Sequence, residues 1–215
     1  MLQPRPSRTG LRVACLLSAA LLLSACAGDQ DAAPGDGIND PYEAGNRKVH
    51  NFNRDLDRAL VRPVSRGYVK AVPGEAQMIV GNFATNLGKP AVATNSLLQG
   101  DLRGFGLSTY RFVLNSTLGI AGLFDVATEL GIADHDTDFG ETLHVWGAGE
   151  GAYIELPLLG PSTQRDALGK VVDLFTNPVT YRLNTTESNT ARATSIASRV
   201  GDRGRFSDTV DFRIV

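Results

Sequence analysis

Apolar residues along most of this chain recur every three or four positions, which is the spacing of one face of an α-helix. Pro41 after Asp40 predicts the start of the first such helix. Its basic and acidic residues lie around an apolar stripe that consists of Val49, Phe52, Leu56 and Leu60. The stripe fits two positions equally well, packing against a protein core or lying at a membrane interface.

The chain then predicts three further helices, separated by proline and glycine signals. Breaks are expected at Val61-Arg62-Pro63 and at residues 71–74. Another helix should begin at Pro90 and end at Gln99-Gly100, and Asp101 should cap the next one. The helix between the second break and Pro90 has an apolar face made of Ala76, Ile79, Val80, Phe83 and Leu87.

Residues 118–124 (LGIAGLF) are apolar on every side of a helical wheel. Such a segment is either fully buried or placed in lipid, and it is too short to cross a bilayer. Thr163, with Asp166 three residues later, predicts the start of a helix that Asn177-Pro178 ends. A last helix is expected around residues 187–200. Because no stretch alternates convincingly as a strand does, the predicted fold class is all-α, in a single domain.

The first 25 residues predict a lipoprotein signal peptide. Arginines precede a short apolar stretch, residues 16–23, which ends in Ser24-Ala25-Cys26. A cysteine directly after small residues is typical of a bacterial lipobox, in which the thiol of Cys26 receives a diacylglyceryl group. By resemblance to bacterial lipoproteins, Ala27 rather than aspartate after this cysteine favours export to the outer membrane over retention at the inner one. Several acyl chains on one N-terminus suffice for stable anchoring.

Charge and length limit the remaining possibilities. Without the three arginines of the leader, 18 basic residues face 23 acidic ones, a net charge of −5, which disfavours nucleic acid as a partner. Residues 26–38 are small and polar and predict a flexible tether. We expect a helical domain over residues 39–183 and a C-terminal segment, residues 184–215, that carries one helix and a tail.

Little in the sequence indicates catalysis or a metal. The alternating aspartates at 134, 136 and 138 begin like an EF-hand loop, but Phe139 and Val145 stand where that loop needs glycine and glutamate. A solvated acidic loop is the simpler interpretation. The three histidines form no zinc-binding pair, and no spacing implies a catalytic triad. We therefore expect no enzyme activity, no cofactor and no metal.

Glycines alternate after the only tryptophan, at Gly147, Gly149 and Gly151. Glycine permits positive φ, so this stretch fits a mobile gate, a lipid-facing turn or a loop that approaches a phosphate. A plain turn between two elements is an equally good interpretation.

The chain resembles the MlaA (VacJ) family of outer-membrane lipoproteins over roughly residues 39–178. The motifs that carry the resemblance are DPYE (40–43), NFN (51–53), VRP (61–63), KPAV (89–92), LLQG (97–100), NST (115–117), FDVA (124–127), DFGETL (138–143), WGAGEGAY (146–153) and LPLLGPST (156–163).

This resemblance implies a ring-shaped helical protein that lies in the periplasmic leaflet of the outer membrane, in contact with a porin trimer. It also implies an amphipathic channel through which mislocalised phospholipid leaves the outer leaflet for a periplasmic phospholipid carrier. The family's gating loop matches WGAGEGAY, which gives a gating role to Gly147, Gly149 and Gly151. Two alternatives stay open: a lipoprotein that only scaffolds a porin, and a lipid-anchored periplasmic hydrolase.

Overall fold

Helices dominate the computed structural model, which describes residues 39–178 and 185–206. The prediction of a helical single domain is confirmed, with one small addition, a two-stranded antiparallel sheet. In chain order the elements are α2 (Glu43–Leu56), the π-helix η1 (Asp57–Val61), α3 (Arg62–Ala71), α4 (Gly74–Leu98), α5 (Leu102–Thr117), α6 (Val126–Glu129), α7 (Phe139–Val145), β1 (Tyr153–Leu156), β2 (Gly160–Thr163), α8 (Gln164–Thr176) and α9 (Thr185–Arg205).

The helical path from α2 to α3 is continuous, so the predicted break at Val61-Arg62-Pro63 is wrong. Pro63 has no N–H to donate, and the helix accommodates it by widening to the π-helix η1 in the preceding turn. The Arg62 N–H accordingly reaches back five residues to the Asp57 carbonyl. The start of α2 also differs from the prediction: Asp40 accepts a hydrogen bond from the Tyr42 N–H, and the helix begins at Glu43.

Pro90 lies inside α4, so the prediction that it begins a new helix is wrong. The packing of α4 against α5, α7, α8 and α9 holds the helix together despite the missing N–H. Its end does follow the prediction, because α4 stops at Leu98 and Gly100 takes a φ of +77°. Asp101 caps α5 by accepting a hydrogen bond from the Gly104 N–H at 2.9 Å.

Two asparagines attach α2 to the β-hairpin. The Asn46 amide donates to the Tyr153 carbonyl at 3.1 Å and accepts from the Glu155 N–H at 2.9 Å. Seven residues on, Asn53 donates to the Leu156 carbonyl at 2.9 Å. Two helical turns separate these asparagines, so they lie on the same face of α2. Their side chains form hydrogen bonds with backbone groups of β1, as a neighbouring strand would.

Glu155 is the buried carboxylate of this junction, and a pocket of about 260 Å³ lies beside it. The Tyr153 hydroxyl donates to Glu155 at 2.6 Å, and His50 lies 3.4 Å from the same side chain. The hydrogen bond to Glu155, helped by burial, raises the pKa of Tyr153 to about 12.

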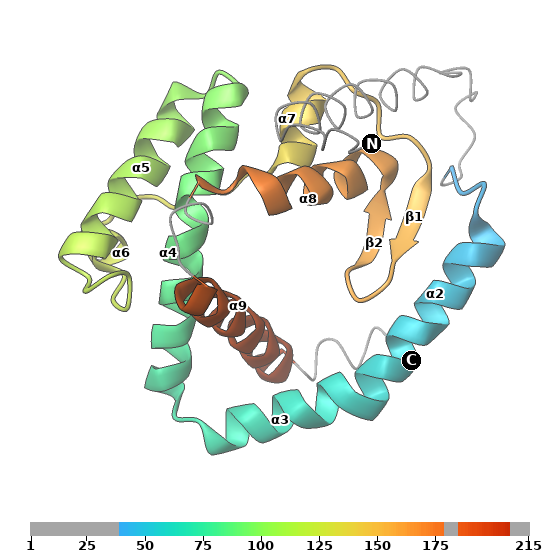
Figure 1. Cartoon of the computed structure of the whole chain (residues 1–215), viewed down its shortest axis with the longest axis horizontal. Coiled ribbons are helices and arrows are strands. Elements are labelled where there is room, and N and C mark those ends of the chain that lie inside the picture. The colour runs from blue at the N-terminus through green and yellow to red at the C-terminus, as the bar shows by residue number, and fades with distance from the viewer. Residues whose placement is uncertain (1–38, 179–184, 207–215) are drawn as a thin grey trace, which may run out of the picture. The chain divides into compact units, whose positions relative to one another are not determined.

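Contacts among the described elements form a closed circuit within residues 40–206 (Figure 1). The helical run α2–η1–α3 leads to α9, which packs on both α3 and α4. From α4 the contacts continue through α7 and α8 to β1, which returns to α2, as the expected ring requires. The helix α5 with α6 packs on the side of α4.

Polar side chains fill the interior of this fold. The buried apolar residues of the described chain are only Val92, Ala93, Ala127, Leu143 and Ala152. Polar and charged residues outnumber them, among them Gln77, Asn86, Lys89, Asn95, Arg111 and Glu155. Large apolar residues, by contrast, are exposed along α2, α4, α5, α8 and the connecting segments. No helix in the described ranges is both long and apolar enough to cross a membrane.

A glycine contact and an ion pair attach α9 to the rest of the fold. A Cβ at Gly204 would come within 2.6 Å of the Ser65 carbonyl oxygen, so the two backbones touch where α9 crosses α3. In the preceding residue, Arg203 donates two hydrogen bonds of 2.8 Å to the two carboxylate oxygens of Asp57. These bonds hold the pKa of Asp57 below its ordinary value of 3.8, although burial opposes them.

Replacing Asp57 by asparagine is expected to weaken the attachment of α9 by about 1.5–3 kcal/mol, the range for hydrogen bonds to a charged group. Because the folded-state pKa of Asp57 is lowered, its contribution is complete above about pH 4 and is lost as the pH falls through that folded-state value. Hydrogen exchange of the α9 amides at pH 7 measures the loss. Asp55→Asn is the control, because Asp55 is exposed and pairs with its neighbour Arg54. Equal exchange rates in the two variants would contradict the prediction.

Candidate functional site

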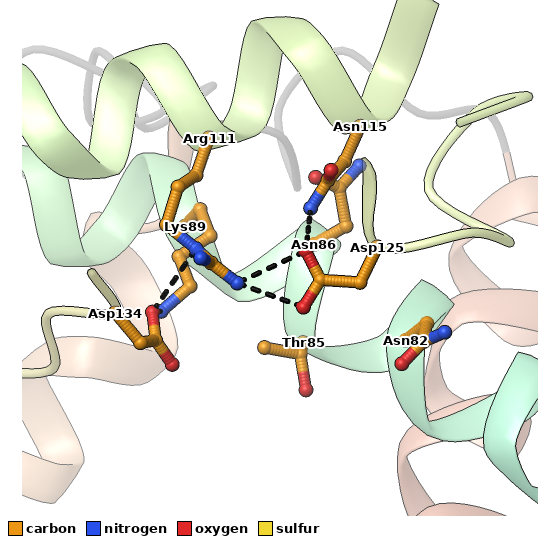
Figure 2. Close-up of a pocket in the computed structure, with 8 residues that line it drawn as sticks. All are labelled: Asn82, Thr85, Asn86, Lys89, Arg111, Asn115, Asp125 and Asp134. Carbon is orange, nitrogen blue, oxygen red and sulfur yellow. Dashed lines mark hydrogen bonds and ion pairs between the residues drawn. The ribbon is translucent and has the colours of Figure 1, made fainter. Parts of the chain in front are cut away.

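A polar pocket of about 200 Å³ lies between α4, α5 and the segment that follows α5 (Figure 2). Two of its charged side chains are cations and two are carboxylates. The helix α4 contributes one face at helical spacing, and α5 contributes two side chains from the opposite side. The complete lining consists of Asn82, Thr85, Asn86, Lys89, Arg111, Asn115, Asp125 and Asp134.

Arg111 holds the segment after α5 against the helix. It is 3% exposed, and its guanidinium donates to the Ile132 carbonyl at 2.5 Å and to Asp125 at 2.8 Å. Asn115, one turn on, donates to Asp125 at 2.9 Å and accepts from the Ala127 N–H. Burial by itself raises the pKa of Asp125, but hydrogen bonds from Thr128 and Asn115 and the charge of Arg111 outweigh it and lower the pKa.

Asp134 bridges two buried cations. Its Oδ1 lies 2.5 Å from Lys89 Nζ and 3.3 Å from Arg111 Nε, while the carboxylate itself is 55% exposed. Lys89, 4% exposed, also donates to the His135 carbonyl at 2.9 Å. The three alternating aspartates are exposed, as the predicted solvated acidic loop requires, but two of them also make specific contacts. Asp134 pairs with the buried cations, and Asp138 caps α7 by accepting from the Glu141 N–H. Within the described ranges no group of three or more histidine, cysteine or acidic residues could hold a metal ion.

Residues 118–124 form a tight series of turns beside the pocket, and not a helix. The Gly122 N–H donates to the Asn115 carbonyl at 2.7 Å, and the Phe124 N–H donates to the Gly119 carbonyl at 3.0 Å. Ile120 adopts a φ of +52°, which is rare for a β-branched residue. Its side chain is 62% exposed, so full burial, one of the two predicted alternatives, is wrong. We call residues 118–124 the apolar loop.

The structure places the three glycines of the predicted gate in different backbone environments. Gly147 ends α7 with a φ of +88° and donates to the His144 carbonyl at 2.8 Å. Gly151 has a φ of +72°, and a Cβ there would lie 2.5 Å from Gln164 Oε1. A Cβ at Gly149 would meet nothing within 4 Å among the described residues. The gating role of these residues stays a prediction.

Alanine substitutions at Gly149 and Gly151 should show which position requires glycine for its backbone conformation. Gly151→Ala is expected to cost about 1–2 kcal/mol, the cost of a left-handed conformation, and to displace Gln164 from the Ala152 N–H. Gly149→Ala should change stability by less than about 0.5 kcal/mol. Urea unfolding in detergent, followed by the fluorescence of Trp146, compares the two. A loss in Gly149→Ala as large as in Gly151→Ala would contradict this assignment.

The predicted interface stripe runs along α2 and continues at Leu60 into η1. It does not form the buried side of α2, which carries Asn46. Phe52 and Leu60 are 53% and 56% exposed, and Val49 and Leu56 are partly exposed. Its position at a membrane stays a prediction. Cys26, the predicted lipidation site, lies outside the described residues.

Together these features define a class of protein: a helical fold whose polar groups face inward and whose large apolar groups face outward. A family model described as MlaA lipoprotein matches residues 38–213. The chain belongs to the MlaA lipoprotein family.

Individual relatives agree with this assignment. The Escherichia coli K12 protein named intermembrane phospholipid transport system lipoprotein MlaA is 38% identical over 169 residues, which cover 77% of this chain and 66% of that protein. A Rickettsia felis protein is 38% identical over 145 residues, covering 67% of this chain and 58% of that protein. The chain thus spans less than two thirds of the length of these relatives.

A solved structure also matches. It is described as "Structural basis for maintenance of bacterial outer membrane lipid asymmetry" and has a TM-score of 0.68 and 33% sequence identity to this chain. The match covers 79% of this chain and 85% of the other.

Proposed function

We propose that this protein takes part in intermembrane phospholipid transport, as the name of its Escherichia coli relative states for that protein. In this proposal it lies in the periplasmic leaflet of the outer membrane and removes phospholipid from the outer leaflet through an amphipathic passage. The phospholipid then goes to a periplasmic carrier, and a porin trimer is the partner within the membrane. The observation that carries the proposal is the inward polar and outward apolar distribution of side chains.

That distribution is costly in water and favourable in lipid. Each 100 Å² of apolar surface removed from water contributes roughly 2.5 kcal/mol. Large apolar residues such as Leu102, Leu174 and Phe175 are more than half exposed, and the buried residues are mainly polar. A hydrocarbon environment would cover the former, and the polar interior offers hydrogen-bonding groups to a lipid head group. Helices satisfy their own backbone groups, as a lipid environment requires.

Several predictions from the sequence form part of this proposal. The lipid on Cys26 would anchor the chain. The apolar stripe would place α2 and η1 at the interface, through Val49, Phe52, Leu56 and Leu60. The turn containing Gly147, Gly149 and Gly151 would gate the passage. Since Gly147 and Gly151 already hold left-handed conformations, movement would centre on Gly149.

Surface-exposed phospholipid in a deletion strain tests the proposal. An acyltransferase that acts only on phospholipid in the outer leaflet reports the exposure. We expect exposure to rise on deletion and to return to its normal level when the gene is restored, and to stay high with a Cys26→Ala version, which lacks the anchor. If exposure does not change on deletion, while the protein copurifies with a porin from the strain that carries the gene, the proposal is contradicted and a scaffold is favoured. Hydrolysis of a phospholipid by the purified protein would favour an enzyme.

A further inference from the structure

We infer that the pocket between α4 and α5 binds the head group of a zwitterionic phospholipid, one that carries a phosphate and an ammonium group, while the apolar loop contacts its acyl chains. This inference rests on the proposed function and adds to it the place and the charge type of the lipid that is bound.

The phosphate side of the site is marked by Asp134. An exposed carboxylate that bridges two buried cations occupies the position that an anion would take between Lys89 Nζ and Arg111 Nε. Arg111 Nε makes no hydrogen bond within the described chain, although it lies 3.3 Å from Asp134. A phosphate offers more oxygen atoms than one carboxylate oxygen and can accept from both cations at once. Because Asp134 is half exposed, its side chain can turn outward and leave this position free.

Acceptors on the opposite side suit an ammonium group. Asp125 lines the pocket across from Lys89 (Figure 2). The Oδ1 of Asn86, a residue only 2% exposed that also lines the pocket, has no hydrogen-bond partner among the described residues. An unpaired buried acceptor is costly, and an ammonium donor would satisfy it.

The charge of the lining decides between lipid types. Two cations, Lys89 and Arg111, and two carboxylates, Asp125 and Asp134, leave the pocket with no net charge. A zwitterionic head group has no net charge and preserves that balance, because its phosphate meets the cations and its ammonium meets Asp125. An anionic head group adds a charge that nothing neutralises, which is unfavourable at a buried site.

The apolar loop lies at the rim of this pocket. The Asn82 amide donates to the Leu123 carbonyl at 3.2 Å, and the Asn86 amide donates to the Ser116 hydroxyl at 2.9 Å. A Cβ at Gly122 would come within 2.6 Å of the Asn86 Cβ, so loop and pocket wall are in direct contact. The loop exposes Leu118, Ile120 and Phe124 in a fixed backbone conformation. A lipid held by its head group would therefore meet apolar side chains next to the glycerol.

The decisive variant is Asp134→Asn, which keeps an oxygen for Lys89 and gives the pocket a net positive charge. The matched control is Asp136→Asn, which removes the same charge from an exposed residue of the same segment that does not line the pocket. Binding of two soluble probes, dihexanoylphosphatidylethanolamine and dihexanoylphosphatidylglycerol, is measured on the detergent-solubilised protein by calorimetry. Inorganic phosphate is the third probe.

We expect the wild-type protein and Asp136→Asn to prefer the ethanolamine lipid equally. In Asp134→Asn the ratio of the two dissociation constants should shift toward the glycerol lipid by about tenfold, which corresponds to about 1.4 kcal/mol. An equal ratio in all three proteins would overturn the inference. So would inorganic phosphate that binds as tightly as the lipids, since the site would then be one for a free anion.

A second variant keeps the test valid if Asp134→Asn does not fold. Thr85 lines the pocket from an exposed position on α4, so Thr85→Trp should fill the pocket without disturbing the interior and weaken both lipids at least about tenfold. Unchanged lipid binding in Thr85→Trp would overturn the inference. Failure of the proposed function is recognised separately: surface-exposed phospholipid would then not respond to deletion of the gene, whatever the probes show.

Discussion

Replacing Gly169 by alanine is expected to destabilise the fold by about 3 kcal/mol, the upper end of the usual range for overpacking. Gly169 lies where α8 crosses α7, and a Cβ there would clash with the Gly140 backbone nitrogen and lie 2.5 Å from its Cα. Both obstacles are backbone atoms, so no side-chain rotation relieves the clash. The two helices would have to separate. Thermal unfolding in detergent, followed by circular dichroism and by Trp146 fluorescence, measures the effect.

Gly106→Ala is the matched control for this experiment. Gly106 lies within α5, is exposed, and has nothing within 4 Å of a Cβ position among the described residues. Alanine there should raise the stability by about 0.5–1 kcal/mol through its higher helix propensity. The same chemical change should therefore have opposite signs at the two positions. Destabilisation of similar size in both variants would show that α7 and α8 do not make the close contact described.

The apolar periodicity predicts the helices well but does not identify which face of each helix is buried in the fold. On α4 it predicts an apolar face that includes Ile79 and Phe83, and both residues are only partly buried. The buried residues of that helix instead include Asn86, Lys89 and Asn95. Polar residues at helical spacing are thus the signal for the interior of this protein. A periodic pattern shows that a helix has two faces, but it does not say whether water or lipid lies outside.

Local signals fail where tertiary contacts compensate for them. Proline predicts a helix break because it lacks an N–H, yet Pro63 is accommodated by a π-turn and Pro90 by the packing of α4. The hairpin escapes sequence prediction because its strands are four residues each and contain Pro161 and Gly160, which disfavour strands. Its stability depends on asparagines of α2 more than one hundred residues earlier, which no local pattern reveals.

The pocket can be predicted from the sequence only in part. The motifs that carry the family resemblance include Lys89, Asn115 and Asp125, but the resemblance gives none of them a role. The pairing of Lys89 with Asp134 joins residues 45 positions apart. From the sequence, the alternating aspartates are expected to form only a solvated acidic loop. In the structure Asp134 also pairs with buried cations and Asp138 caps α7.

Replacing Arg111 by methionine is expected to cost about 3–5 kcal/mol, the range for removing one member of a buried ion pair. The change leaves the Ile132 carbonyl without its donor and Asp125 without its cation. Methionine keeps the apolar length of the side chain, so the loss reports the polar contacts and not a cavity. Urea unfolding of the detergent-solubilised protein at pH 7 provides the measurement. Arg103→Met is the control, because Arg103 is exposed on the same helix, and it should change stability by less than about 0.5 kcal/mol.

The pH dependence separates the ion pair from a general packing defect. Since the folded-state pKa of Asp125 is lowered from 3.8, its contribution is complete above about pH 4 and is lost as the pH falls through the folded-state value. Removing the Arg111 charge moves that pKa back toward its ordinary value, so the acid-induced loss of stability should be smaller in Arg111→Met than in the wild-type protein. A loss of the same size in both would mean that Arg111 acts through packing alone. In that case only Lys89 would attract an anion bound between Lys89 and Arg111. The change in the ratio of lipid dissociation constants expected for Asp134→Asn would then be smaller.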